Sequence, residues 1–432
     1  MSIFGAMTTA ISGLSSQSTA FSNIGDNLAN TQTTGYKGVD TTFENYVTSS
    51  TLQTNGSSAV VARPEYTNTT QGTISQTTNP LDIAVSGQGF FPVSLPNGSV
   101  QGQPTFGSQQ YFTREGDFKL DANGYLVNST GHFLNAWPIN AAGQVDQTQL
   151  KPLQVGQSGY APVPTSSATI SANLPATPAT TPYSVTTEMP VTDSLGTSHN
   201  LDLTWSTTAT PNVWSLSIAN GATTIGSVNV AFGSASTNPV PEGTIGSVTA
   251  TGAGLTPSAY VAGQQATVDF TATLGPAAQP ITLNLGTFGG TNGVTQFAGS
   301  TYNLISLSQN GVEPGGFAGV SMQSNGNLTV NYDNGQSRTV GQIPIVTFAS
   351  PDSLQTHDGQ AYTATKESGN PRANQVGSNG AGTLVTSSLE GSNVDIASEF
   401  TKLIVAQRAY SANTKMVTTA DDMLQQTIDM KR

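Results

Sequence analysis

The chain of 432 residues contains no cysteine. This absence excludes disulfide bonds, thiolate metal sites and cysteine nucleophiles, so the stability of the protein must come from packing and assembly. The chain is also too long for one compact core, and we expect about two to four domains.

Positive charge is scarce. Lys and Arg number 13 against 25 Asp and Glu, the formal net charge is −12, and no Lys or Arg lies between Lys151 and Arg338. A segment without cations cannot neutralise phosphates, which argues against nucleic acid as a partner. Charged residues make up only 9% of the chain, so it is polar and neutral rather than strongly acidic.

Long hydrophobic runs are missing too. No apolar run approaches the roughly 20 residues that a membrane-spanning helix needs. The first residues also lack the basic segment and compact hydrophobic stretch of a signal peptide. Few charges and abundant Thr, Asn, Gln and Gly are nevertheless typical of a secreted surface protein. We therefore expect no membrane insertion, and export by a dedicated apparatus without a cleaved signal peptide.

The chain does have a heptad ladder of apolar residues at each end. Such a ladder forms one seam of a coiled-coil helix, which must find a partner helix. The spacing predicts helices over 3–29 and 393–430 and a subunit that polymerises through its termini. The alternative is an intramolecular antiparallel pair that never polymerises. The seam residues are Ile3, Met7, Leu14, Phe21, Ile24 and Leu28 in the first ladder, and Ile396, Leu403, Tyr410, Val417 and Leu424 in the second.

Between the helices the sequence is patterned as β-strands. Residues 200–205 and 213–218 alternate apolar and polar side chains, and Asp333-Asn334-Gly335 marks a turn. Residues 162–178 and 286–300 are interpreted as linkers from their composition.

The predicted fold class is multidomain α+β, with long N- and C-terminal coiled-coil-type helices flanking two mainly-β domains, the outer one inserted into the inner. The terminal helical domain is predicted to comprise residues 1–30 and 393–432, and an extended linker region residues 31–80 and 360–392. The inner β domain is predicted over 81–144 and 301–359, and the inserted outer β domain over 145–300.

Four ordered blocks of the sequence resemble the bacterial flagellar rod and hook family. They are IGDNLAN at 24–30 with TTGYK at 33–37, LDIAVSGQGFF at 81–91, YFTREGDF at 111–118 with GYLV at 124–127, and LEGSNVDI at 389–396 with IVAQRAY at 404–410. The length of the chain and the segment VTDSLGTSH at 191–199 resemble the hook members rather than the shorter distal rod members.

The resemblance implies a structural subunit that self-assembles into the flagellar hook, the flexible tubular universal joint that transmits torque from rod to filament. It implies an extracellular helical homopolymer with contacts to the distal rod protein, the hook cap, the hook–filament junction proteins and the type III export apparatus. Residues Phe43 to Val47 match a Phe-x-x-x-hydrophobic export-gate motif, and a half-buried strand explains them equally well. The family-motif residues expected to shape turns are Asn27, Asn30, Gly35, Gly87, Gly89 and Phe90.

We expect no enzymatic activity and no catalytic, cofactor-binding or metal-binding residues. Asp117, Asp121 and Asn123 lack the spacing of a calcium loop, and the His residues are isolated. A secreted glycosidase needs two facing carboxylates, and both it and a β-rich adhesin leave the terminal helices unused. A distal rod-type subunit is the alternative within the family.

Overall fold

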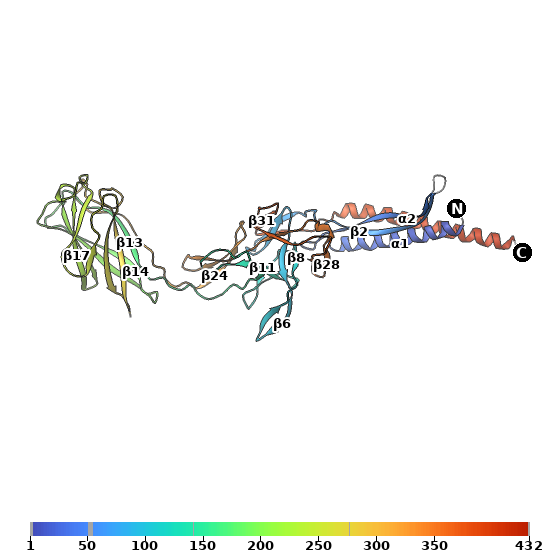
Figure 1. Cartoon of the computed structure of the whole chain (residues 1–432), viewed down its shortest axis with the longest axis horizontal. Coiled ribbons are helices and arrows are strands. Elements are labelled where there is room, and N and C mark those ends of the chain that lie inside the picture. The colour runs from blue at the N-terminus through green and yellow to red at the C-terminus, as the bar shows by residue number, and fades with distance from the viewer. Residues whose placement is uncertain (1–2, 51–54, 141, 276, 431–432) are drawn as a thin grey trace. The chain divides into compact units, whose positions relative to one another are not determined.

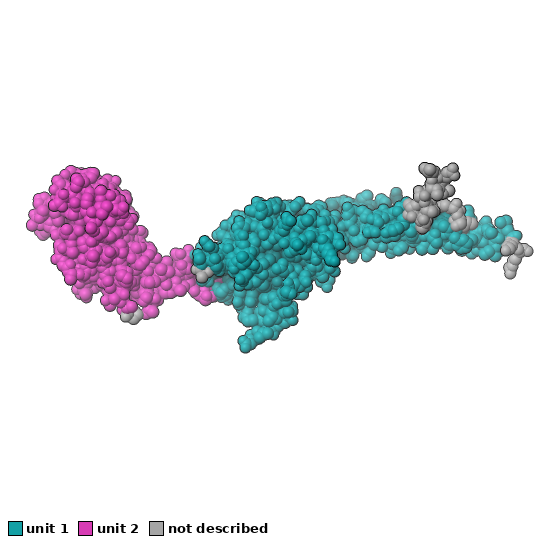
Figure 2. Space-filling model, in the orientation of Figure 1, with its two compact units in different colours: residues 1–157, 318–331, 337–432 teal, residues 158–317, 332–336 magenta. Residues whose placement is uncertain are grey.

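The computed structural model describes residues 3–50, 55–140, 142–275 and 277–430 (Figure 1). The protein is mostly β-structure, with a helix near each end of the chain. It divides into two compact units, which Figure 2 colours separately. Unit 1 contains residues 1–157, 318–331 and 337–432, and unit 2 contains residues 158–317 and 332–336.

Both predicted terminal helices are present in unit 1 and lie side by side (Figure 1). Helix α1 spans Ile3–Ala29 and α2 spans Ile396–Asp429. Helix α2 begins after Asp395 because the side chain of this residue accepts a hydrogen bond from the Ser398 backbone N–H at 2.8 Å. The two predicted helices are confirmed, and their coiled-coil packing stays a prediction.

Residues 31–80 are predicted as part of an extended linker region, and the structure shows a hairpin within them. Strands β1 (Val39–Ser50) and β2 (Asn55–Tyr66) pair antiparallel. Hydroxyl groups of α1 bind the hairpin: Ser16 Oγ donates to the Val60 carbonyl at 2.8 Å, and the Val60 N–H donates to Ser12 Oγ at 3.1 Å. The hairpin is therefore fastened along α1, since these bonds satisfy backbone groups that its partner strand leaves free.

The rest of unit 1 is built on a sheet with the strand order β24-β25-β26-β11-β5-β8-β29-β28, to which β9, β10 and β12 add further pairs. Its strands are β5 (Phe91–Ser94), β8 (Tyr111–Thr113), β9 (Lys119–Leu120), β10 (Leu126–Val127), β11 (Phe133–Pro138), β12 (Lys151–Pro152), β24 (Phe317–Met322), β25 (Asn327–Tyr332), β26 (Ser337–Gln342), β28 (Gln355–His357) and β29 (Ala361–Thr363). Short antiparallel pairs adjoin it: β3 (Ile74–Gln76) with β32 (Ser388–Glu390), β4 (Ile83–Ser86) with β31 (Thr383–Thr386), β6 (Pro96–Val100) with β7 (Gln103–Phe106), and β27 (Ile345–Thr347) with β30 (Arg372–Asn374). The pairs β3–β32 and β4–β31 join the segments that follow α1 and precede α2.

Unit 2 consists of two sheets that share one hydrophobic core. One sheet has the order β19-β20-β21-β13-β22 with β23 on β13, and the other has the order β14-β15-β16-β17-β18. The strands are β13 (Ser167–Asn173), β14 (Ser184–Thr192), β15 (Ser198–Thr207), β16 (Val213–Asn220), β17 (Thr223–Phe232), β18 (Ile245–Ala250), β19 (Leu255–Pro257), β20 (Gln265–Thr273), β21 (Ala278–Thr287), β22 (Val294–Thr295) and β23 (Asn303–Gln309). The alternation predicted for β15 and β16 is confirmed, because Leu203, Trp205, Leu216 and Ile218 are all buried in this core.

The interpretation of residues 162–178 and 286–300 as linkers is wrong. Strand β13 lies in the first segment and pairs with β21, β22 and β23, and β22 lies in the second. Small residues conceal the alternation of β13, whose Ala168, Ile170 and Ala172 are buried in the core of unit 2.

Candidate assembly surface

The α1–α2 pair only partly covers the predicted seam residues. The rings of Phe21 and Tyr410 meet edge to face with centroids 6.2 Å apart, and Tyr410 is still 42% exposed. Ile24 is buried, Ile396 is exposed, and the side chain of Ile3 lies outside the described residues. The other seam residues are half-buried, namely Met7, Leu14, Phe21, Leu28, Leu403, Val417 and Leu424. One chain alone therefore leaves part of both ladders accessible to a second contact.

The helices also expose large apolar side chains that the ladders do not include. Nine lie on or at the ends of α1 and α2: Phe4, Ile11, Phe400, Ile404, Val405, Met416, Met423, Ile428 and Met430. Met416, Met423 and Met430 are seven residues apart, as are Phe4 and Ile11, so a second heptad pattern was readable in the sequence. An exposed apolar surface of this kind marks a contact with another protein.

A buried polar network joins α1 and α2 at the end of the pair where α1 ends and α2 begins. Its centre is the motif residue Asn27. The Asn27 Nδ2 donates to the Val39 carbonyl at 3.0 Å and to Glu399 Oε2 of α2 at 3.3 Å. Its Oδ1 accepts from the Val39 N–H at 2.9 Å and from the Tyr36 hydroxyl at 3.2 Å. Lys402 Nζ donates to Glu399 at 2.8 Å and also to Asp40. The network sets where α1 ends, where the chain turns, and where α2 begins.

The motifs also build an ion cluster that the sequence analysis did not predict. Glu390 is fully buried and pairs with Lys37 Nζ at 2.5 Å and with Arg114 Nη1 at 3.0 Å. Lys37 Nζ also donates to the Thr70 carbonyl at 2.8 Å, and Arg114 Nη2 donates to the Gly87 carbonyl at 2.7 Å. Three distant chain segments are thereby joined in the interior of unit 1.

Burial lowers the pKa of Lys37 from its ordinary value, although the neighbouring Glu390 carboxylate acts in the opposite direction. The desolvation of the ammonium group thus outweighs its attraction to the carboxylate. Ion pairs of this kind add little net stability, but removing one partner leaves an uncompensated buried charge. We conclude that the cluster specifies how the segments meet.

The motif glycines allow close backbone approaches around this cluster. Gly87 and Gly89 have φ angles of 100° and 121°, in the range that favours glycine, and a Cβ on Gly89 would lie 2.1 Å from Ile345 Cγ2. Phe90 follows, is buried, and lies under the guanidinium of Arg114 with 5.3 Å between Arg114 Cζ and the ring centroid. The turn therefore places the face of the Phe90 ring against the guanidinium of Arg114.

We expect Gly35→Ala to destabilise unit 1 by at least about 2 kcal/mol. Gly35 has a φ of 70°, and a Cβ there would lie 2.7 Å from the Glu115 backbone nitrogen. Urea unfolding measures the change. The matched control is Gly25→Ala in α1, where an added Cβ meets no atom within 4 Å. Equal stability of the Gly35→Ala variant and the unchanged protein would contradict the assignment.

Asn30 lies at the end of α1, and the export-gate residues lie farther along β1. The side chain of Asn30 donates to the Asp26 carbonyl at 2.9 Å and accepts from the Thr33 hydroxyl at 3.0 Å, which closes the end of α1. Phe43 is exposed on β1, and the side chain of Val47 lies outside the described residues. That these two residues form an export-gate motif stays a prediction.

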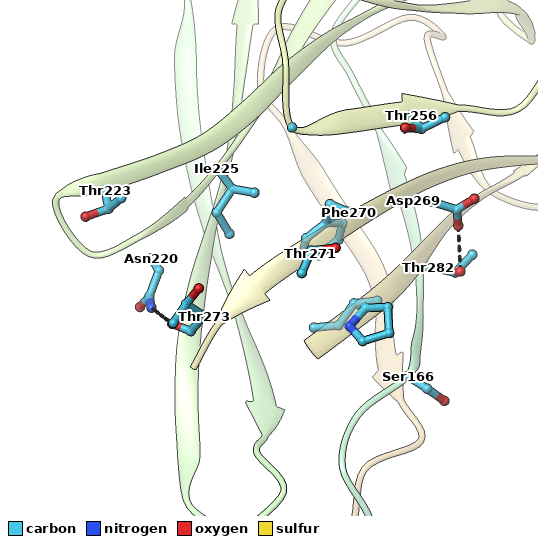
Figure 3. A pocket seen from close by; sticks show the side chains of 13 residues that line it. Ser166, Asn220, Thr223, Ile225, Thr256, Asp269, Phe270, Thr271, Thr273 and Thr282 are labelled. Atoms are coloured by element: carbon cyan, nitrogen blue, oxygen red, sulfur yellow. Dashed lines mark hydrogen bonds between the residues drawn. The ribbon is translucent and has the colours of Figure 1, made fainter. Parts of the chain in front are cut away.

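A surface cavity of about 810 Å³ in unit 2 has walls of mixed polarity (Figure 3). Six of its lining residues are Ser or Thr and four are Ile, Phe or Pro. Asp269 accepts a hydrogen bond from Thr282 at 2.6 Å, and Asn220 donates to the Thr273 carbonyl at 3.2 Å. Asp269 is the only carboxylate among the lining residues, so the facing carboxylate pair of a glycosidase is not formed by this lining.

Within the described residues, no group of three or more His, Cys, Asp and Glu is placed to hold a metal ion, and no helix is long and apolar enough to span a membrane.

Four protein-family models match the chain in order. They are the flagellar basal body rod protein model at residues 7–37, the flagellar hook protein FlgE/F/G D1 domain at 84–163, the flagellar basal body protein FlaE D2 domain at 162–312, and the flagellar basal body rod FlgEFG protein C-terminal model at 385–430. The flagellar hook protein FlgE of Brucella abortus is 31% identical over 436 residues, covering 100% of both chains. The chain belongs to the flagellar hook protein family. It is a structural subunit of the hook, and the predicted family and function are confirmed.

Similarity extends to other hook proteins. The hook protein of Escherichia coli K12 is 28% identical over 448 residues, covering 99% of this chain and 100% of its own. The crystal structure of the Helicobacter pylori hook protein FlgE2 is 14% identical, covers 72% of this chain and 98% of its own, and has a TM-score of 0.47. The similarity to the curated hook proteins thus extends over the terminal helices and both units alike.

Proposed function

We propose that copies of this chain polymerise into the hook tube through their paired terminal helices, packed as coiled-coil-type seams. The observation that carries the proposal is the apolar surface left exposed on α1 and α2, where Phe4, Val405 and Met423 are 67%, 62% and 52% exposed. When a second copy covers these exposed apolar side chains, the contact is stabilised by about 25 cal/mol per Å² of apolar surface removed from water. The seam residues named above, from Ile3 to Leu424, are the proposed assembly residues.

The proposed domain plan follows the chemistry of each region. The helical domain of 1–30 and 393–432 forms the inner wall, since its surface is the most apolar. The linker region of 31–80 and 360–392 and the inner β domain of 81–144 and 301–359 come next. The outer β domain of 145–300 is inserted into the inner one and faces water, which its Thr- and Asn-rich surface tolerates.

The bending of the joint is assigned to the outer domain. Apolar contacts between the terminal helices hold neighbouring copies in place. The outer domains slide past one another as the tube curves. Unit 2 contains no Lys or Arg and seven Asp and Glu residues, so contacts between two such units lack ion pairs. Weak polar contacts without strong directional pairs allow this sliding at low cost.

The wider role is proposed by analogy with the family. The subunit is extracellular and non-enzymatic, is exported by the flagellar type III apparatus without a cleaved signal peptide, and meets the distal rod, hook cap and hook–filament junction proteins. Recognition of the Phe43–Val47 motif by the export apparatus, before the chain folds, belongs to this proposal.

Immunogold electron microscopy of isolated hook–basal bodies tests the proposal. An antibody raised against residues 145–300 is expected to label the short curved segment outside the cell envelope, since these residues are placed on the outer surface. A pre-immune serum is the control. Gold confined to the rod would contradict the hook role, and an unlabelled hook that contains the subunit would contradict the exposed outer domain.

A further inference from the structure

The face of α1 that points away from α2 carries two apolar side chains and one charge. Phe4 and Ile11 are 67% and 50% exposed, and Asp26 is exposed and is the only charged side chain before Lys37. At about 100° per residue these three lie within an arc of about 60°, opposite the buried residues Ala10, Ala20, Ile24 and Asn27. We call Phe4, Ile11 and Asp26 the α1 outer stripe.

A matching stripe runs along α2. Met423 and Met430 are 52% and 83% exposed, and Arg408 is exposed. These three also lie within an arc of about 60°, outside the arc that holds the buried residues Glu399, Ala406 and Ala420. We call Arg408, Met423 and Met430 the α2 outer stripe. Within the described residues, neither Asp26 nor Arg408 forms an ion pair.

The two stripes have the same spacing in opposite directions. Phe4 and Ile11 are seven residues apart, as are Met430 and Met423. Ile11 and Asp26 are fifteen residues apart, as are Met423 and Arg408, which is about 22 Å along each helix. One antiparallel register therefore brings Phe4 opposite Met430, Ile11 opposite Met423, and Asp26 opposite Arg408.

These contacts cannot form within one copy. Inside the chain α1 and α2 already pack through other faces, with Phe21 against Tyr410 and Asn27 against Glu399, and the two outer stripes point away from each other. Copies that run in the same direction place α1 of one beside α2 of the next in the antiparallel sense that the register requires. A contact between two different faces can repeat from copy to copy in an open helical array, and a helical tube requires such an array.

We infer that the outer stripe of α1 binds the outer stripe of α2 on a second copy of this chain, with Asp26 paired to Arg408 and two apolar contacts fixing the register. The inference rests on the proposed polymerisation through the terminal helices and names its partner surface. Opposite charges that meet across an interface select the correct register, and methionine side chains pack well against Phe and Ile.

The surface beside Arg408 supports the same register. A hollow of about 300 Å³ is lined by Gln407, Arg408, Ser411, Ala412 and Lys415, so it lies between two cations of α2. In the proposed register Ser22 of the second copy lies opposite Ala412 and is exposed on α1. Two small side chains that face each other let the helices approach closely beside the ion pair.

Charge reversal tests the pairing. Asp26→Arg or Arg408→Asp alone is expected to lower the yield of hooks at least about tenfold, because like charges then face each other at every contact. The double variant is expected to restore assembly. Glu367→Arg, an exposed site outside the helices, is the control and is expected to assemble normally. Normal assembly of both single variants, or failure of the double variant beside a working control, would overturn the pairing while leaving polymerisation itself established.

Disulfide trapping tests the register separately, because the chain contains no native cysteine. Oxidised hooks of the Ile11→Cys, Met423→Cys double variant are expected to give a ladder of covalent oligomers on a non-reducing gel. The matched control joins Ile11→Cys to Lys415→Cys, which the register separates by about 12 Å, beyond disulfide reach. Hooks that yield only monomer, or an equal ladder from the control, would overturn the register. Failure of the unchanged chain to polymerise would instead refute the proposed function.

Discussion

Replacing Leu403 by Asp is expected to abolish assembly of the hook subunit while unit 2 stays folded. Leu403 is half-buried on α2 beside α1, in the predicted seam. An aspartate there loses the apolar contact, worth about 2–5 kcal/mol for a core leucine, and adds a carboxylate that has no cation to pair with in an apolar seam. Every contact in the polymer repeats this loss. Electron microscopy for tubes and sedimentation for polymer mass provide the measurement.

The matched control for this change is Thr414→Asp, which places the same charge at an exposed position of α2. It is expected to leave tubes intact. Far-ultraviolet circular dichroism checks that the β units of both variants remain folded. Tubes formed by the Leu403→Asp variant would contradict the assignment of the seam, and loss of the β signal would contradict the independence of the units.

The second large effect is expected at the buried ion cluster. Glu390→Ala should destabilise unit 1 by about 3–5 kcal/mol, because Lys37 and Arg114 would then be left as uncompensated charges in the interior. Denaturant unfolding followed by tryptophan fluorescence separates the two units, since Trp137 lies in unit 1 and Trp205 and Trp214 lie in unit 2.

The control for the ion cluster is Glu367→Ala, which removes an exposed carboxylate of unit 1 and is expected to change stability by less than about 0.5 kcal/mol. The unfolding of unit 2 should be the same in both variants. A Glu390→Ala variant as stable as the control would show that the cluster does not hold the segments together.

The helices and the β-rich middle could be predicted from local patterns alone. The heptad spacing of α1 and α2 and the alternation of β15 and β16 are periodic signals, and each fell on the predicted element. Strand β13 could not be found in this way, because two of its core positions are the small residues Ala168 and Ala172. Alternation between Ala and Ser or Thr carries little contrast, and the prolines nearby suggested a linker.

The site was predictable where its residues repeat or, as with Asn27, lie in a family motif. The seam residues follow a period of seven, and so do Met416, Met423 and Met430, which a search for a second ladder would have found. Glu390 lies 353 residues from Lys37 and 276 from Arg114 along the chain. No local pattern links residues so far apart, and only the fold brings their charges together.

Electron cryo-microscopy of hooks assembled from this chain shows whether the terminal helices join neighbouring copies. We expect a tube whose inner wall is formed by α1 and α2, with apolar side chains of neighbouring copies in contact and unit 2 on the outer surface. Terminal helices that lie outside the tube wall, or that contact no neighbouring copy, would contradict it.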